Sequence, residues 1–102
     1  MASDNPIYQL KLSAEAYDDL VNIQNYTFTN FGELGWIRYE KEILLGFETI
    51  TQHPEVGHHR NDIPQSYRAW IIKEHVILYR IEDHLIYVTR VLHKRMNFRW
   101  VF

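Results

Sequence analysis

Residues 87–98, YVTRVLHKRMNF, close the predicted fold and determine how the C-terminal half is arranged. Successive side chains of a β-strand point to opposite faces, and the first six residues follow that alternation. The two predicted faces are Tyr87, Thr89 and Val91 on one side and Val88, Arg90 and Leu92 on the other. His93, Lys94 and Arg95 come where the strand ends, so we expect this end of the sheet to present polar groups to a partner.

Two more strands are predicted directly before it, at residues 67–73 (YRAWIIK) and 75–81 (HVILYRI), and the closing strand itself covers 84–92. Glu82 and Asp83 form the predicted turn between the last two strands. Because links this short can only join antiparallel neighbours, the three strands form an antiparallel meander.

The N-terminal half begins with an alternating strand at residues 7–12, IYQLKL, and continues as helix. Ser13 is the predicted N-cap of a first helix running from Ala14 to about Thr29. Its buried stripe is predicted to be Ala16, Leu20, Ile23 and Thr27, flanked by Tyr17, Val21 and Phe28, with Asp18, Asp19, Asn22 and Asn25 in solvent.

Gly32 is a natural left-handed stop for this first helix. A second helix is predicted from about Glu33 to Thr51, where the His53-Pro54 pair ends it. Its apolar residues recur every three or four positions, at Trp36, Tyr39, Ile43, Phe47 and Ile50. The short link between the helices requires an antiparallel helical hairpin.

The predicted architecture is therefore α+β, a two-layer βααβββ domain in which an antiparallel sheet packs against an N-terminal helical hairpin. One domain covers residues 1–102, with flexible tails at 1–6 and 99–102. The sheet face away from the hairpin is expected to be open and partly polar. It would carry Arg68, Arg80 and Arg90 together if the strand register places them on one face.

Composition narrows the function classes. The chain has no cysteine, which excludes disulfides and thiolate metal sites and is compatible with a reducing cytoplasm. No run approaches the roughly 20 apolar residues of a membrane span, and the first residues do not resemble a secretory signal. Residues 1–66 carry four basic against ten acidic residues, and residues 67–102 carry seven against three. The basic half indicates an anionic partner, unless the two halves neutralise each other in the fold.

Four segments resemble the RelE/ParE toxins of type II toxin–antitoxin pairs: 12–27 (LSAEAYDDLVNIQNYT), 53–63 (HPEVGHHRNDI), 67–81 (YRAWIIKEHVILYRI) and 88–98 (VTRVLHKRMNF). The resemblance covers about residues 7–98, and the closing run is more similar to the ParE branch than to the RelE branch. It implies a small cytoplasmic bacterial toxin, neutralised by a partly disordered antitoxin that folds on it. ParE-like members poison DNA gyrase, whereas RelE-like members cut mRNA in the ribosome.

Metal-free RNA cleavage needs a general base, a general acid and cations around the phosphate. The candidates for a nuclease are Arg68, Lys73, Arg90, His93 and Arg95. RelE-like members place a Tyr or His near the C-terminus, but this chain has no tyrosine after Tyr87, and Phe98 cannot transfer protons. His93 has a structural alternative as a strand-end histidine that hydrogen-bonds the backbone. An mRNA endonuclease is therefore the alternative hypothesis, and a binding inhibitor without catalysis is the leading one.

Gyrase inhibition requires only a surface that binds the enzyme. The predicted target-binding residues are Arg95, Met96, Phe98, Arg99 and Trp100. Packing against the domain's own core is the open alternative for Phe98, Trp100 and Phe102.

Antitoxin binding is expected in either case, and it makes the toxin part of a hetero-oligomer. An antitoxin segment can add a strand to the sheet edge or lay a helix on an apolar groove. Its acidic residues are predicted to meet Arg68, Arg80, Arg90 and Arg95. A non-toxic domain that only binds the antitoxin is the third hypothesis. No cofactor is expected, and the spacing of His53, His58, His59 and Asp62 does not match a metal-ligand pattern, so no metal site is predicted.

Overall fold

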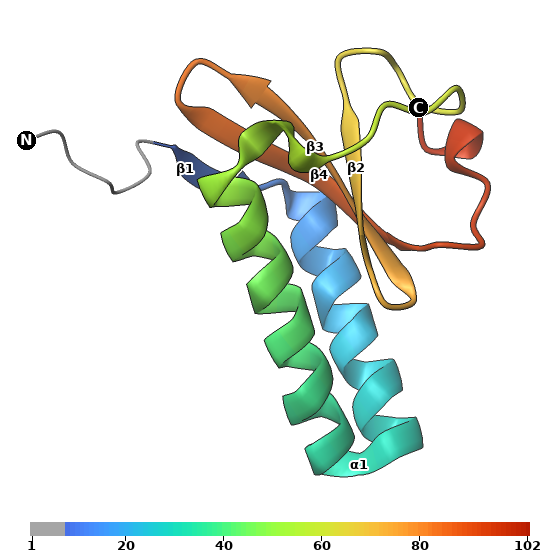
Figure 1. Ribbon diagram of the computed structural model, residues 1–102. Helices are drawn as coiled ribbons and strands as arrows, with labels where there is room; N and C mark the ends of the chain where they lie inside the picture. The colour runs from blue at the N-terminus through green and yellow to red at the C-terminus, as the bar shows by residue number, and fades with distance from the viewer. Residues whose placement is uncertain (1–7) are drawn as a thin grey trace, which may run out of the picture.

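The computed structural model describes residues 8–102 as two layers, a helical hairpin on one face of a four-stranded sheet (Figure 1). The elements in chain order are β1 (Gln9–Leu12), α1 (Ala14–Gln52), η1 (Pro54–Val56), β2 (Arg68–Ile72), β3 (His75–Glu82), β4 (Leu85–His93) and η2 (Phe98–Trp100). The predicted α+β class is confirmed. The expected N-terminal tail, 1–6, lies outside the described residues. Among the elements from β1 onward, no helix has the length and apolar character needed to cross a membrane.

The element labelled α1 is two antiparallel arms joined at Gly32, as the sequence predicted. Gly32 has φ 76° and ψ −177°, a conformation that is essentially restricted to glycine and that interrupts the helical backbone. Ser13 caps the first arm, because its hydroxyl accepts the N–H of Ala16 at 2.9 Å. The break turns a 39-residue helical segment back on itself, so both arms reach the sheet.

The sheet has the strand order β1-β4-β3-β2. The meander β2-β3-β4 is antiparallel as predicted, with the second turn formed by Asp83 and His84, one residue later than expected. The prediction of a wholly antiparallel sheet is wrong at β1, which pairs parallel with β4. The short-link rule does not apply to β1, because 72 residues separate its end from the start of β4.

Both faces of the sheet are covered. The larger core lies between sheet and hairpin and includes Ile23, Ile50, Tyr79 and Val88. A second core lies on the opposite face, where Ile63 from the loop after η1 and Phe98 from η2 pack against β2, β3 and β4. The expectation of an open polar face is therefore wrong, because the loop and the C-terminal segment cross it.

The C-terminal residues also differ from the predicted tail. Val101 packs against the second core, and the ring of Phe102 lies 4.8 Å from that of Tyr67. Residues 99–102 are thus held against the second core by the apolar side chains of their own segment.

A β-bulge interrupts the predicted alternation of β4. Leu78 pairs with Arg90 whereas Tyr79 pairs with Val88, so Thr89 is the extra residue on β4. As a result, Val88 and Val91 both face the helical hairpin. The sequence placed these two valines on opposite faces, and that part of the prediction is wrong.

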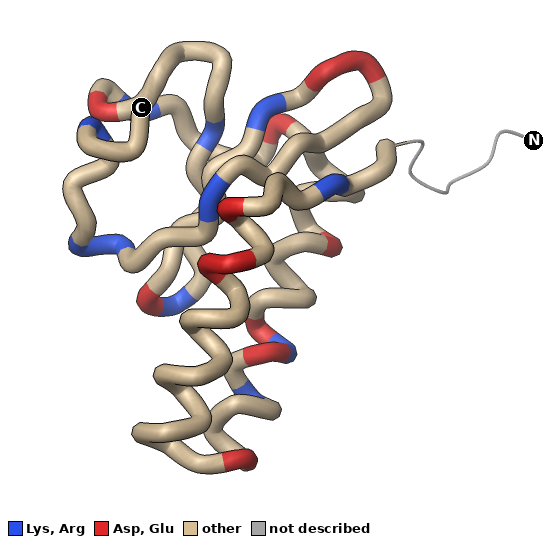
Figure 2. The backbone as a smooth tube through the Cα atoms, turned by 180° about the vertical axis from the view of Figure 1, so that it is seen from behind, with Lys and Arg blue, Asp and Glu red and all other residues tan. Residues whose placement is uncertain are grey.

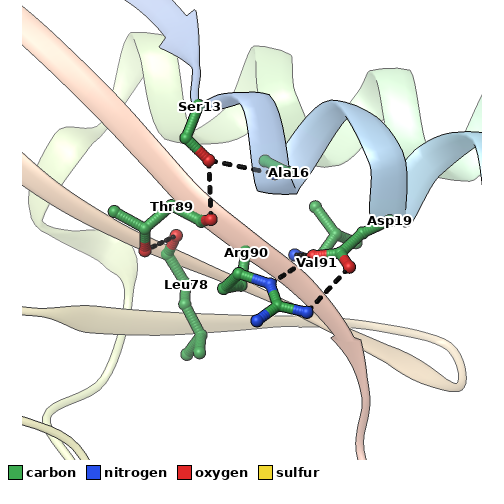
Figure 3. Close-up of polar contacts among 7 residues, drawn as sticks. All are labelled: Ser13, Ala16, Asp19, Leu78, Thr89, Arg90 and Val91. Carbon is green, nitrogen blue, oxygen red and sulfur yellow. Dashed lines mark hydrogen bonds and ion pairs between the residues drawn. The ribbon is translucent and has the colours of Figure 1, made fainter. Parts of the chain in front are cut away.

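The bulge lies where β4 loses its neighbour. β1 ends at Leu12, opposite Val88, so among residues 8–102 no strand lies beside the last residues of β4 on that side. The start of α1 replaces the missing strand: the Ser13 hydroxyl donates to the Thr89 carbonyl at 2.8 Å, and an Asp19 carboxylate oxygen accepts the Val91 N–H at 2.9 Å (Figure 3). Side chains thereby satisfy backbone groups that a strand would otherwise pair.

Asp19 also binds Arg90 through two parallel hydrogen bonds, of 2.8 Å to Nε and 3.0 Å to Nη2 (Figure 3). These bonds raise the pKa of Arg90. The sequence predicted Asp19 in solvent, but only 11% of its side chain is exposed. We call the contacts of Ser13 and Asp19 with residues 89–91 the bulge clamp.

The bulge clamp is testable through Asp19→Ala. The substitution leaves the Arg90 guanidinium and the Val91 N–H without their acceptor, so we expect it to lower the free energy of unfolding by about 2–3 kcal/mol. Urea denaturation measures the loss. Asp18→Ala is the matched control, because Asp18 is exposed on the same turn and gains the same helix propensity. Equal stability of the two variants would contradict a stabilising clamp.

Candidate functional site

Arg68, Arg80 and Arg90 do not all lie on one face of the sheet, and basic residues are spread over the helices, the sheet and the C-terminal segment (Figure 2). Cross-strand partners lie on the same face, and Arg68 pairs with Tyr79, which packs toward the helical hairpin. The Arg68 guanidinium donates to the carbonyls of Glu55 at 3.1 Å and Gly57 at 2.9 Å. The Arg68 guanidinium therefore binds backbone carbonyls of residues 55–57 within the same domain.

Arg80 lies on the opposite face of β3. Its guanidinium is 4.9 Å from the ring centroid of Tyr87, its cross-strand partner, and it is ion-paired with Glu82. The strand register, which the sequence left open, puts Arg68 and Arg80 on opposite faces, so the three arginines do not form one basic surface. The bulge moves Arg90 to the edge of the sheet, where it meets Asp19.

An exposed groove of about 450 Å³ lies beside Arg90. Its lining combines a guanidinium, a thioether, an amide and an indole, from Arg90, Met96, Asn97, Trp100 and Val101. We call it the C-terminal groove. Met96 is 50% exposed and Trp100 86% exposed, whereas apolar side chains of this size are usually buried. Three predicted binding residues, Arg90, Met96 and Trp100, thus meet in one place.

Two local features shape this groove. The Asn97 side chain accepts the N–H of Arg99 at 3.1 Å and begins η2. Phe98 is fully buried in the second core, with the Arg60 guanidinium 4.5 Å from its ring centroid. Because Phe98 anchors the short helix from inside, Trp100 is held at the surface.

The two aromatic residues of η2 therefore separate the two interpretations that the sequence left open. Phe98 packs in the core and presents no side chain to a partner, so its predicted role in target binding is wrong for this fold. Trp100 does not pack in the core. Arg95 and Arg99 are both exposed, and they flank groove residues Met96 and Trp100 in the sequence. Arg99 also lines a second, polar depression with Arg60 and Asp62.

A cluster of titratable residues lies where the β2–β3 turn meets the end of β4. The rings of His75 and His93 are cross-strand neighbours with centroids 5.4 Å apart. The Tyr39 hydroxyl from the second arm of α1 lies 2.6 Å from His75 Nδ1, and burial raises the pKa of Tyr39. Glu74 approaches His93 at 3.9 Å and Lys94 at 3.5 Å.

His93 behaves as the strand-end histidine that the sequence allowed. Its Nδ1 accepts the N–H of Arg95 at 3.1 Å, which leaves Nε2 on the side of Glu74. Lys73 lies in the adjacent β2–β3 turn. Arg68, on β2, is farther away, because it pairs with Tyr79, four residues after His75 on β3. The five nuclease candidates are therefore not gathered around one point.

Sequence reasoning missed Tyr39 and His75 as neighbours of His93. The antiparallel register of β3 and β4 brings the two histidines opposite each other, so a hairpin alignment could have found His75. Tyr39 comes from a distant helix, and no local pattern indicates its contact. Within residues 8–102, no group of three or more His, Cys, Asp or Glu side chains is placed to hold a metal ion.

Comparison with known proteins places this geometry in context. Residues 10–98 match the family model described as ParE toxin of type II toxin-antitoxin system, parDE. Toxin ParE1 of Caulobacter vibrioides is 32% identical over 89 residues, which cover 87% of this chain and 92% of that protein.

Solved structures share the fold at lower identity. A chain of the chromosomal ParDE toxin–antitoxin system from P. aeruginosa is similar with a TM-score of 0.74 and 16% identity, covering 87% of this chain and 98% of that one. The E. coli DinJ–YafQ complex is similar with a TM-score of 0.61 and 12% identity, covering 84% and 91%. The YoeB dimer of Staphylococcus aureus is similar with a TM-score of 0.59 and 17% identity, covering 84% of this chain and 95% of that one.

The titratable cluster predicts a pH-dependent stability. Burial and then the neighbouring His93 lower the pKa of His75 below its usual 6.5. Below about pH 6.5 the unfolded chain therefore binds a proton that the folded chain excludes, so stability falls as the pH decreases from 6.5. We expect His75→Gln to reduce the fall in melting temperature between pH 7 and pH 5. Exposed His84→Gln is the control and should keep the wild-type slope; two equal slopes would refute the assignment.

Proposed function

Because this chain belongs to the ParE family of toxins from type II toxin–antitoxin systems, we propose that it inhibits DNA gyrase by binding it and that a cognate antitoxin neutralises it. The observation that carries the proposal is the C-terminal groove, where Met96 and Trp100 stand exposed beside Arg90. Tryptophan and arginine are the side chains that most often dominate protein–protein binding energy.

The burial of Phe98 supports binding over catalysis. Phe98 stands in the segment where the RelE-like alternative places a proton-transferring side chain, and it is enclosed in the second core. The surface at this point offers stacking, apolar contact and a cation. These groups suit a partner protein, and none of them needs to change protonation state.

We propose that the antitoxin binds the same side of the molecule through Arg90 and Arg95. Arg90 lines the groove while Asp19 holds its Nε and Nη2. An acidic antitoxin side chain there would form a charge-assisted hydrogen bond with a guanidinium already held in place. This proposal does not include Arg68 or Arg80. Arg68 donates to the carbonyls of Glu55 and Gly57, and Arg80 is ion-paired with Glu82.

Trp100→Ala tests the proposed target surface. We expect the purified toxin to inhibit gyrase supercoiling, and we expect the variant to need at least about tenfold more protein for half-inhibition, because an exposed indole anchor is a typical hot spot. Ile71→Ala is the control, since Ile71 is 53% exposed on β2, away from the groove.

Three outcomes would count against this function. No effect of folded wild-type toxin on gyrase at large molar excess would overturn the proposed target. Equal inhibition by Trp100→Ala and wild type would show that the C-terminal groove is not the surface that binds gyrase. Unchanged growth on expression without the antitoxin would indicate the third hypothesis, a domain that only binds its antitoxin.

The paired imidazoles favour one second candidate, a ribosome-dependent mRNA endonuclease. The ring centroids of His75 and His93 lie 5.4 Å apart, and Lys94 directly follows His93 in the chain. A general base and a cation are therefore available at one end of the sheet. If this candidate holds, wild-type toxin cleaves mRNA at the ribosomal A site, and His93→Ala or Arg95→Ala abolishes cleavage. His84→Ala should cleave normally. Intact mRNA with wild-type toxin would exclude the nuclease.

A further inference from the structure

A polar depression of about 430 Å³ lies where the loop after η1 meets η2. His59, Arg60, Asn61 and Asp62 line it from the loop, and Arg99 lines it from η2. The lining thus combines two guanidinium groups, an imidazole, an amide and a single carboxylate. Guanidinium and amide groups donate hydrogen bonds, so this composition suits an anionic ligand. We call this site the polar depression.

The carboxylate of the polar depression is already neutralised. Asp62 accepts two parallel hydrogen bonds from Arg60, of 2.8 Å from Nε and 2.7 Å from Nη2. The bond from Arg60, together with the charge of Arg99, lowers the pKa of Asp62, so the carboxylate stays ionised within this pair. Two arginines against one aspartate leave one positive charge in excess.

Neither arginine of the polar depression is fully used by the domain. Within residues 8–102, no hydrogen bond or ion pair engages the guanidinium of Arg99, and no acceptor binds Nη1 of Arg60. The three arginines of the sheet differ, because each binds an acceptor of the protein. The polar depression therefore keeps donors that a ligand can use.

The second core holds these donors in place. The Arg60 guanidinium lies 4.5 Å from the ring centroid of Phe98, and Ile63, three residues after Arg60, packs in the same core. The side chain of Arg60 is accordingly 33% exposed. A guanidinium fixed by stacking and by a bidentate carboxylate loses little freedom when it binds a ligand, which favours affinity.

We propose that the polar depression binds a phosphate group, and that this group is a phosphodiester of the duplex DNA held by gyrase. The inference rests on the proposed function, which brings the toxin to an enzyme with bound DNA. Arginine and asparagine side chains make many of the contacts to phosphate oxygens in protein–DNA complexes. Such contacts carry no sequence information, so the site would accept any DNA that gyrase holds.

η2 connects this site with the C-terminal groove. Arg99 and Trp100 are consecutive in the short helix, yet Arg99 lines the polar depression and Trp100 lines the groove. One element thereby presents a cation and an indole to neighbouring parts of a complex. An inhibitor that contacts both the enzyme and its DNA gains from the two contacts together, because the second contact becomes intramolecular.

The test is an NMR titration of the full-length, isotope-labelled toxin, separately with inorganic phosphate and with a DNA duplex of about 12 base pairs. We expect the duplex to shift the backbone amides of residues 59–62 and 99, with a Kd on the order of 100 µM that is typical of non-specific contacts. Inorganic phosphate should shift the same amides at higher concentration, because it lacks the neighbouring phosphates of the duplex. Duplex binding should weaken as NaCl rises from about 50 to 200 mM, since binding releases counterions.

Two substitutions with matched controls identify the site. Arg99→Gln removes one of the two guanidinium groups, and it should weaken duplex binding about tenfold and reduce the salt slope by about one. Asn61→Asp places a second carboxylate in the polar depression and should also weaken binding. Arg38→Gln and Asn25→Asp are the controls, because they make the same changes of charge at exposed positions on the helical hairpin. Both controls should bind the duplex within about twofold of wild type.

Several results would overturn the proposal. A duplex that leaves residues 59–62 and 99 unshifted would refute it, and so would equal losses of binding in Arg99→Gln and Arg38→Gln. Shifts with inorganic phosphate alone would exclude the DNA contact and indicate a site for a free anion. Shifts with the antitoxin but not with the duplex would assign the polar depression to an acidic protein segment.

The two proposals fail in different ways. Gyrase inhibition by wild type without these duplex shifts would refute the phosphate site alone. Duplex shifts without gyrase inhibition would refute the proposed function and leave the phosphate site standing.

Discussion

The bulge clamp is the constraint on which the arrangement of this domain depends. β4 pairs with β1 only as far as Val88, and beyond that point its backbone would be left without a partner on one side. Ser13 and Asp19, both at the start of α1, supply the missing hydrogen bonds. The same contacts attach the helical hairpin to the sheet across more than 70 residues of chain. The clamp therefore joins the two layers and sets the register of the strand that carries the C-terminal segment.

The basic half of the chain is largely used within the molecule. The guanidinium of Arg68 binds loop carbonyls, Arg80 lies against Tyr87 and Glu82, and Arg90 is held by Asp19. Acidic residues of the first half thus neutralise part of the basic second half in space, as with Asp19 and Arg90. The basic residues of this half that are exposed are Lys73, Lys94, Arg95 and Arg99, and three of these four follow β4. Lys94 lies 3.5 Å from Glu74. A charge imbalance along a sequence consequently overstates the charge that a partner meets.

The two apolar surfaces differ in how the chain holds them. Trp100 is exposed because Phe98, two residues earlier, is anchored in the second core and fixes η2. The apolar side chains at the outer end of the helical hairpin, among them Phe28, Phe31 and Leu34, are exposed because Gly32 folds the helical segment into arms that extend past the sheet. The first surface carries a guanidinium and the second is nearly uncharged, so the two surfaces suit partners of different chemistry.

Local patterns in the sequence determined the elements: the Ser13 cap, the glycine stop at Gly32 and the antiparallel meander all follow from short-range backbone rules, and the structure has each of them. The C-terminal run also indicated Met96 and Trp100 as candidate binding residues, but it left open whether Trp100 packs in the core. Only the tertiary structure decided the parallel place of β1, the bulge at Thr89, the pairing of Asp19 with Arg90 and the burial of Phe98. Each of these depends on contacts between residues far apart in the chain, and periodicity within one segment carries no information about which distant segment will lie against it.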